Sequence, residues 1–349
     1  MFSEARRPLT IEALSDLEMG GNKLELYPGP KQEVRAVVLF PEWHLGETVL
    51  ETGAEIPEGI RDWHRQLFLD AERLVTSYKV QRVILEADTG PTLLQKHRPG
   101  LTRTKDVEKM IRKEKSVAEQ SGRKVNEDVM EWLRIGLDPD LDIKARRNGA
   151  EALLGRISAT RLLEAVYGQE PELEFKGLED PIHHKNRGAI DAKLQGFLRA
   201  LERNQAQVPF RGQSIKILQL LDLALKGDEE AKAHYNWVRD VHLVEEYLEP
   251  TTRIAINECN EKVSRKVATL PGDSLMFYGS YHAADMIERL QRSRTVALRA
   301  SVPTKLTEAM VDYQGPQDLF TAEGHTRRAK LLLPPFEKIQ ETMAKLKSL

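Results

Sequence analysis

Cysteine is almost absent from this chain of 349 residues, which has a single one, Cys259. One cysteine cannot form an internal disulfide, so the sequence fits a reducing compartment better than an oxidising one. No pattern that activates a thiol surrounds Cys259, and we expect a small buried side chain there rather than a nucleophile.

Long apolar runs are missing as well. No window approaches the roughly 20 apolar residues that a membrane helix needs. The first ten residues, MFSEARRPLT, lack the apolar stretch that is typical of a signal peptide. We therefore expect a cytoplasmic protein that does not bind a membrane.

Neither sign of charge dominates, because 52 Lys and Arg stand against 54 Asp and Glu, for a net charge of -2. This balance gives no argument for binding to nucleic acid. With 40% hydrophobic and 30% charged residues, the composition is typical of a globular protein rather than a disordered one. The expected partner is a small-molecule or peptide substrate, and the sequence leaves a homo-oligomer open.

Four short and continuously apolar runs predict strands that are covered on both faces. They are 36–40 (AVVLF), 83–85 (VIL), 274–278 (SLMFY) and 295–298 (TVAL), with weaker candidates at 23–27 and 172–176. An amphipathic segment at 60–78 separates the first two runs, and this order predicts a right-handed crossover with parallel pairing. We predict an α/β fold with a mixed, largely parallel central sheet flanked by helices, with helical insertions and a helical C-terminal segment.

Apolar residues at helical spacing predict further helices at 150–167, 191–204, 213–226 and 228–269, the last interrupted near Pro250. Residues 102–147 are dense in charge, so we expect exposed helices there and a mobile loop near Gly122. The predicted domains are an α/β domain over 1–300, which includes this insertion, and a helical appendage over 301–349. The appendage would dock on a neighbouring surface through Leu331, Leu332, Leu333, Phe336, Ile339 and Met343.

Acidic and histidine residues directly follow four of the predicted strands. They are Glu42 and His44 after the first run, Glu86 after the second, Glu179, Asp180, His183 and His184 after 172–176, and His282 after 274–278. Ligands of open α/β sheets bind outside the carboxyl ends of the strands, so we expect these side chains to converge. Such a group suits acid–base catalysis or coordination of a divalent metal. The adjacent His183 and His184 are expected on the surface.

Sharp local motifs are missing: the chain has no H-E-x-x-H, no Walker A, no G-x-G-x-x-G and no G-x-S-x-G. The predicted site therefore depends on residues from separate segments.

In the segment that begins at Trp237, helical spacing predicts an apolar stripe of Trp237, Val241, Val244 and Leu248. Arg239 would lie nearly opposite that stripe, on an exposed polar face.

The order of these segments resembles the superfamily of the TraB proteins, the Tiki proteases, the erythromycin esterases and the ChaN haem-binding lipoproteins. The matching pieces are PEWH (41–44), LEAD (85–88), GLEDP (177–181), RDVHLVEEY (239–247) and YGSYHAADMIERL (278–290). In that superfamily an early strand ends in G-E-x-H or G-x-x-H, and a late strand ends in a second G-x-x-H. Here Pro41 stands where the early glycine is usual.

The resemblance implies that Glu42, His44, Glu86, Arg239 and His282 line the site, with Glu42, His44 and His282 as ligands where a divalent metal such as Mn²⁺, Co²⁺ or Zn²⁺ is used. We predict a hydrolase of peptidase or esterase type, in which Glu and His activate a water and Arg239 binds an oxyanion, carboxylate or phosphate. The alternative is a non-catalytic protein that binds a metal, haem or a small ligand through the same histidines. A third reading is an interaction protein that has kept the fold and lost the chemistry.

Overall fold

The computed structural model of the chain describes residues 6–19, 22–29, 35–42, 58–88, 92–120, 125–279, 282–299 and 322–347. The contacts divide the chain into two units. Unit 1 is Met1–Asp180 with Asn260–Met310, and unit 2 is Pro181–Cys259 with Val311–Leu349. This division differs from the predicted boundary at residue 300, because residues 181–259 share an apolar core with the C-terminal helices.

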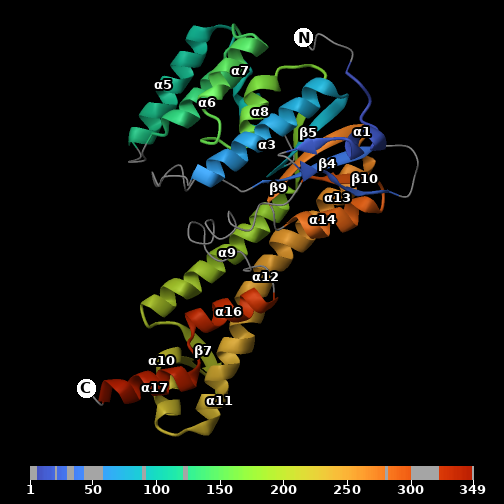
Figure 1. The fold of residues 1–349 in the computed structure, drawn as a ribbon. Coiled ribbons are helices and arrows are strands. Elements are labelled where there is room, and N and C mark those ends of the chain that lie inside the picture. The colour runs from blue at the N-terminus through green and yellow to red at the C-terminus, as the bar shows by residue number, and fades with distance from the viewer. Residues whose placement is uncertain are drawn as a thin grey trace. The chain divides into compact units, whose positions relative to one another are not determined.

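A six-stranded sheet forms the centre of unit 1 (Figure 1). Its order is β3-β10-β4-β9-β5-β6. In this sheet β3 and β10 are antiparallel, and the other neighbouring pairs are parallel. The structure therefore confirms the predicted α/β fold with a mixed, largely parallel sheet. The strands are β3 Glu25–Tyr27, β4 Ala36–Glu42, β5 Val80–Asp88, β6 Glu174–Glu179, β9 Asp273–Gly279 and β10 Thr295–Leu298.

The apolar runs of the sequence are the central strands, because a strand covered on both faces has no polar face. Every residue of β4 is buried, as is every residue of β9 after Asp273. The strands that contain the runs 36–40, 83–85 and 274–278 are β4, β5 and β9, and they lie in one sheet, as predicted. The first two are parallel but do not pair directly, because β9 lies between them.

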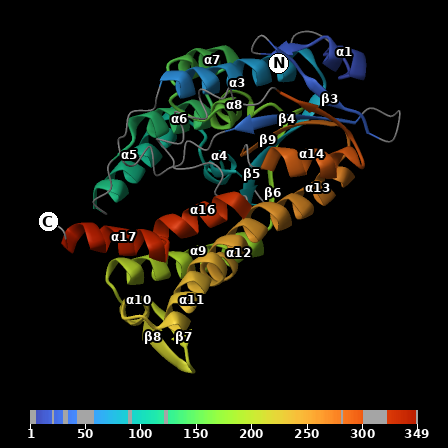
Figure 2. The same ribbon diagram turned by 60° about the horizontal axis from the view of Figure 1, so that its bottom comes forward.

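Helices cover both faces of this sheet (Figures 1 and 2). The crossover helix α3 (Glu58–Ser77) and α8 (Ala159–Tyr167) lie on one side, and α13 (Cys259–Thr269) and α14 (Ala283–Gln291) lie on the other. A two-stranded ladder joins β1 (Glu18–Met19) to β2 (Asn22–Lys23). The other helices of unit 1 are α1 Ile11–Ser15, α4 Leu93–His97, α5 Thr104–Gln120, α6 Glu127–Leu137 and α7 Ile143–Glu151.

The charged insertion is helical, as predicted, but it is not exposed throughout. In α5 the buried residues are Val107 and Ile111, which leaves most of that helix in solvent. In α6, by contrast, Trp132 is buried and its indole N–H donates to the carbonyl of Arg161 at 2.8 Å. The loop predicted near Gly122 lies outside the described residues.

Unit 2 has its own apolar core, which includes Leu220, Val238, Leu243 and Phe336. Residues 213–216 form a strand here and not the start of the predicted helix, because they pair with 207–210 in a hairpin. The elements are α9 Pro181–Glu202, β7 Gln207–Phe210, β8 Gln213–Lys216, α10 Ile217–Leu225, α11 Glu229–Trp237, α12 Glu249–Thr252, α16 Ala322–Leu332, α17 Phe336–Lys347 and the π-helical turns η1 Val238–His242, η2 Val244–Leu248 and η3 Arg253–Glu258.

The π-helical turns overturn the predicted stripe of this segment. A π turn bonds residue i to i+5, so its side chains return to the same face after five residues. The buried row is accordingly Val238, Leu243 and Leu248, while Trp237 is 40% exposed. Arg239, expected opposite the stripe, is buried instead.

Pro250 does not interrupt the helical segment, which continues through the three π turns and α12. The proline stands at the first turn of α12. Proline has no amide N–H to donate, so one main-chain hydrogen bond is missing at this position, where the π turn η2 is followed by α12.

The C-terminal helices dock through part of the predicted set. Leu333 and Phe336 are buried in the core of unit 2, and Leu332 and Ile339 pack against it. Leu331 is 70% exposed, because it lies on the outer face of α16. The side chain of Met343 lies outside the described residues.

Two further predictions concern burial and membranes. Cys259 is buried, as predicted. Among the helices of the described ranges, none combines the length and the apolar character needed to cross a lipid bilayer.

Candidate functional site

The end of β5 and the end of β9 bring Glu86 and His282 together. One carboxylate oxygen of Glu86, Oε2, accepts from the backbone N–H of Gly279 at 2.7 Å. The other, Oε1, lies 3.5 Å from Nε2 of His282, which is the N-cap residue of α14. The pairing of β5 with β9 is thus extended past the strand ends by a side chain, and this holds Glu86 at the carboxyl edge of the sheet.

The orientation of His282 is fixed by a buried neighbour, Asn260, on α13. The amide nitrogen of Asn260 donates to Oδ2 of Asp285 at 2.8 Å, so its oxygen Oδ1 has to face Nδ1 of His282, 2.6 Å away. An amide oxygen accepts hydrogen bonds and cannot donate them, so the imidazole carries its proton on Nδ1. In the neutral imidazole Nε2 is then the basic nitrogen, and it faces Glu86.

The separation of Nε2 and the carboxylate determines what this pair can do. At 3.5 Å the two atoms are beyond the usual hydrogen-bond range of about 2.7–3.2 Å. At this distance Nε2 of His282 can accept a proton from another molecule, and the negative charge of Glu86 then stabilises the imidazolium. The side chain of Glu86 is 12% exposed and that of His282 5%, so the pair lies at the margin of the interior.

Glu42, at the end of β4, makes a second pair on other helices. Its carboxylate accepts from the hydroxyl of Thr160 at 2.6 Å, and Oε1 lies 3.6 Å from Nδ1 of His64. His64, on α3, is fully buried, and neither ring nitrogen hydrogen-bonds to a described residue. Buried polar atoms without a partner are uncommon in native proteins, so His64 joins the candidate residues of this edge.

The two carboxylates lie at the same edge of the sheet and contact different helices. Glu42 is the register partner of Gly279, and Glu86 bonds to the N–H of that same glycine. The helix partners of Glu42 come from α3 and α8, however, and those of the Glu86–His282 pair from α13 and α14, which cover opposite faces (Figure 2).

Metal ligation by Glu42, His44 and His282 stays a prediction. His44 lies outside the described residues. Across the described ranges, no group of three or more His, Cys, Asp or Glu side chains is arranged to hold a metal ion.

The carboxyl end of β6 is occupied by basic side chains of α13. Lys266 donates to the carbonyl of Leu178 at 2.7 Å, and the ammonium of Lys262 lies 3.6 Å from the carboxylate of Asp180. His183 and His184 lie in the first turn of α9, and their side chains are outside the described residues. Among the described side chains, this strand end therefore adds neutralised charge, and the predicted surface position of His183 and His184 stays a prediction.

Arg239 belongs to unit 2, where Asp240 neutralises it. The guanidinium Nε donates to Oδ1 of Asp240 at 2.6 Å, and Nη2 donates to Oδ2. This bidentate pair raises the pKa of Arg239 and lowers the pKa of Asp240. A guanidinium already bound to a carboxylate has less charge to offer an oxyanion.

Sequence reasoning missed Asn260, His64 and Thr160, all of which lie on helices. Each is polar at a position that faces the sheet, and a polar residue on the apolar face of an amphipathic helix is the signal that could have found them. Their partners are 22 or more residues away along the chain, so spacing alone does not reveal the contacts.

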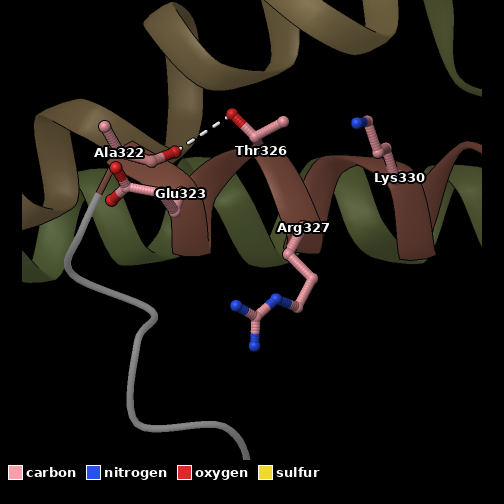
Figure 3. A pocket seen from close by; sticks show the side chains of 5 residues that line it. All are labelled: Ala322, Glu323, Thr326, Arg327 and Lys330. Carbon is pink, nitrogen blue, oxygen red and sulfur yellow. Dashed lines mark hydrogen bonds between the residues drawn. The ribbon is translucent and has the colours of Figure 1, made fainter.

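A cavity of about 450 Å³ in unit 2 does not coincide with either pair. Figure 3 shows that its lining, Ala322, Glu323, Thr326, Arg327 and Lys330, comes from α16 alone. The hydroxyl of Thr326 bonds back to the carbonyl of Ala322 at 3.0 Å. With no imidazole in its lining, this cavity has none of the acid–base chemistry of the strand ends.

In comparisons with known proteins, no family model, no curated protein and no solved structure matched the chain.

Proposed function

We propose that this protein is a hydrolase of ester or peptide bonds in which His282 and Glu86 activate a water. The observation that carries the proposal is the buried amide of Asn260, which holds the basic nitrogen of His282 toward Glu86. An imidazole with a fixed tautomer, next to a carboxylate at the carboxyl edge of a parallel sheet, is suited to general-base catalysis.

In the proposed reaction, Nε2 of His282 takes a proton from water while the water oxygen attacks the carbonyl carbon of the substrate. Glu86 stabilises the imidazolium that results, since its carboxylate oxygen lies 3.5 Å from Nε2. When the tetrahedral intermediate collapses, the imidazolium returns the proton to the leaving oxygen or nitrogen. The proposal assigns no step to Arg239, whose charge is balanced by Asp240.

A divalent metal fits this pair in part. Two donors at about 2.1 Å from a tetrahedral ion are about 3.4 Å apart, and Nε2 and Oε1 are 3.5 Å apart. His282 and Glu86 would hold such an ion, and a bound metal would supply a water of lowered pKa. Catalytic zinc sites usually have three protein ligands, so the proposed mechanism uses residues of the chain alone.

The experiment measures turnover of a panel of aryl esters and short peptides by the purified full chain. Glu86→Gln and His282→Ala should each lower kcat by about 10²-fold or more, because Gln keeps the shape of Glu without its charge and Ala removes the base. Glu72→Gln is the matched control, since the Glu72 side chain is 16% exposed and lies in the same unit. Glu42→Gln tests whether the second carboxylate also takes part.

The double variant Glu86→Gln/His282→Ala should be scarcely slower than either single variant, because the two groups act as a unit. Full activity in either single variant, with the fold checked by circular dichroism, would contradict the proposed mechanism.

The second candidate function is non-catalytic binding of a metal ion, haem or a small ligand, and the donor spacing of His282 and Glu86 favours it. Mn²⁺, Co²⁺ or Zn²⁺ should then raise the Tm of the wild type, because a ligand of the folded state alone stabilises it by mass action. The rise should disappear in His282→Ala. Such a shift without turnover of any panel substrate would favour the binder.

We also propose a cytoplasmic location. The single cysteine supports it, because a chain without an internal disulfide needs no oxidising compartment to fold.

A further inference from the structure

Two arginines in the helical part of unit 1 have buried N–H groups that no described residue accepts. Arg98 follows α4 as its C-cap, and its Nη1 donates to the carbonyl of Gly168 at 2.7 Å, at the end of α8. Its Nε and Nη2 are buried and have no hydrogen-bond partner among the described residues. One side of this guanidinium is thus used and the other is not.

The unused side has a definite shape. In a guanidinium the Nε–H and one Nη2–H point in the same direction and form a fork that matches two oxygens of one anion. Both atoms of this fork in Arg98 are buried. A buried donor without an acceptor is costly, and a buried cation without an anion is more so.

Arg146, on α7, adds a third N–H and a second positive charge. It is 4% exposed, and its Nη2 donates to Oε1 of Gln169 at 2.6 Å and to the carbonyl of Asp138 at 3.3 Å. Its Nε is buried without a partner in the described part of the chain. Burial lowers the pKa of Arg146, and the nearby charge of Arg98 lowers it further, while Glu170, Asp138 and Asp142 raise it by smaller amounts.

Glu164 and Asp138, two of the carboxylates near these arginines, accept hydrogen bonds from other groups. Glu164 accepts a hydrogen bond from the hydroxyl of Thr92, and burial raises its pKa to about 7. Asp138 accepts from the hydroxyl of Thr104 at 2.9 Å and from the backbone N–H of Asp140 at 3.0 Å. Neither carboxylate hydrogen-bonds to the fork of Arg98 or to Nε of Arg146.

We propose that the fork of Arg98 and Nε of Arg146 bind a phosphate group, either the free ion or the phosphate of a small monoester. Three N–H groups on two cations match an anion with at least three oxygens and close to two negative charges. A carboxylate has two oxygens and one charge, so it would leave one donor and one cation without a partner. No residue of this site belongs to the Glu86–His282 pair, so the proposal is independent of the hydrolase.

The experiment is titration calorimetry of the full chain with inorganic phosphate, glycerol phosphate and acetate, at constant ionic strength. We expect saturable binding of phosphate or of the monoester and at least about tenfold weaker binding of acetate, since each charge-assisted bond contributes strongly. Preference for glycerol phosphate would identify a small phosphorylated ligand, and preference for inorganic phosphate would identify the free ion. Acetate binding as tight as phosphate binding would overturn the assignment.

Variants locate the site. Arg98→Gln and Arg146→Gln should each weaken phosphate binding by at least about tenfold. Arg98→Lys, which keeps the charge and removes the fork, should also weaken it and guards against misfolding of the Gln variants. Arg134→Gln is the matched control, because Arg134 is already bound to Glu108 and Glu131.

Thermal melts distinguish this site from a purely structural arginine. With phosphate present, the wild type should gain Tm and Arg98→Lys should gain less. Two results would show that Arg98 only caps α8. One is an equal loss of Tm in Arg98→Lys with and without phosphate, and the other is wild-type phosphate affinity in all three variants of Arg98 and Arg146.

Discussion

Asn260 places its side-chain oxygen 2.6 Å from Nδ1 of His282, and both residues are buried. The amide cannot turn over, because its nitrogen donates to Asp285 and to the carbonyl of His282. Asp285 on α14 therefore decides which nitrogen of the imidazole is basic, and it does so through Asn260.

The first prediction concerns this amide. Asn260→Ala leaves Nδ1 of His282 without its acceptor, so the ring is free to adopt the other tautomer. We expect kcat to fall by about 10-fold to 100-fold. The free energy of unfolding should fall by about 1–3 kcal/mol, which is the cost of one unsatisfied buried group. Asp285→Asn is the control, since an Asn oxygen can still accept from Asn260. ¹⁵N chemical shifts of the ring report the tautomer, and an unchanged tautomer in Asn260→Ala would refute the positioning role.

The second prediction concerns Glu164, whose pKa burial raises to about 7 from an ordinary value of 4.5. A raised carboxyl pKa means that the folded state holds its proton more tightly. This stabilisation is complete below about pH 4.5 and is lost as the pH rises through about 7. Glu164→Gln, whose amide oxygen can still accept from Thr92, should remove that loss and be more stable than the wild type at pH 8.5 by up to about 3 kcal/mol. Urea unfolding at pH 5 and pH 8.5 measures the difference, and parallel pH profiles for the two proteins would contradict it.

The third prediction concerns the buried ion pair of Asp70 and Arg299, which joins α3 to the end of β10 at 2.7 Å. Arg299 also lies over the ring of Trp63, 4.2 Å from its centroid. Asp70→Ala leaves a buried cation, so it should cost about 3–5 kcal/mol. The double variant Asp70→Leu/Arg299→Met should cost less than Asp70→Ala, because neither charge remains. Denaturant unfolding of the wild type, Asp70→Ala and the double variant measures their relative stability. A double variant that is less stable than Asp70→Ala would contradict the prediction.

The fourth prediction uses two leucines of the last helices. Leu333 is 5% exposed and Leu331 is 70% exposed. Leu333→Ala should lower the unfolding free energy of unit 2 by about 2–5 kcal/mol, since it leaves a cavity. Leu331→Ala should change it by about 0.5 kcal/mol or less. Limited proteolysis and thermal melts would show this contrast, and equal effects would mean that the C-terminal helices do not share the core of unit 2.

The sequence was informative where burial on two faces leaves an unbroken apolar run. Each of the six predicted runs overlaps a strand, although 172–173 precede β6 and 23–27 includes Leu24 between β2 and β3. The residues after the runs in β4, β5, β6 and β9 lie at one edge because these parallel strands share a direction. The partners of those residues were not predictable in the same way. His64 and Asn260 reach the edge from helices, and which helix covers which face depends on packing across the whole unit.

The hairpin of β7 and β8 was missed, although it carries a local signal. Arg211 and Gly212 form the two-residue turn, with φ of 48° and 74°. Two successive positive φ values are typical of the turn that suits the twist of antiparallel strands, and glycine is favoured there. The burial of β7 alternates residue by residue, so Q-V-P-F-R-G is a strand and turn, and residues 213–216 after it are the second strand rather than the start of a helix.

The five-residue rows along the π turns also order the aromatic side chains. The ring of Trp237 stacks on that of His242 at 5.3 Å, and His242 meets Tyr247 edge-on at 6.1 Å. In an α-helix each residue advances by about 100°, so deleting one residue from a π turn would restore α geometry and rotate the side chains beyond it out of phase. A change of length within residues 238–248 would therefore displace every later side chain of the row at once, whereas a substitution alters a single position, so insertions and deletions are expected to be excluded from this stretch.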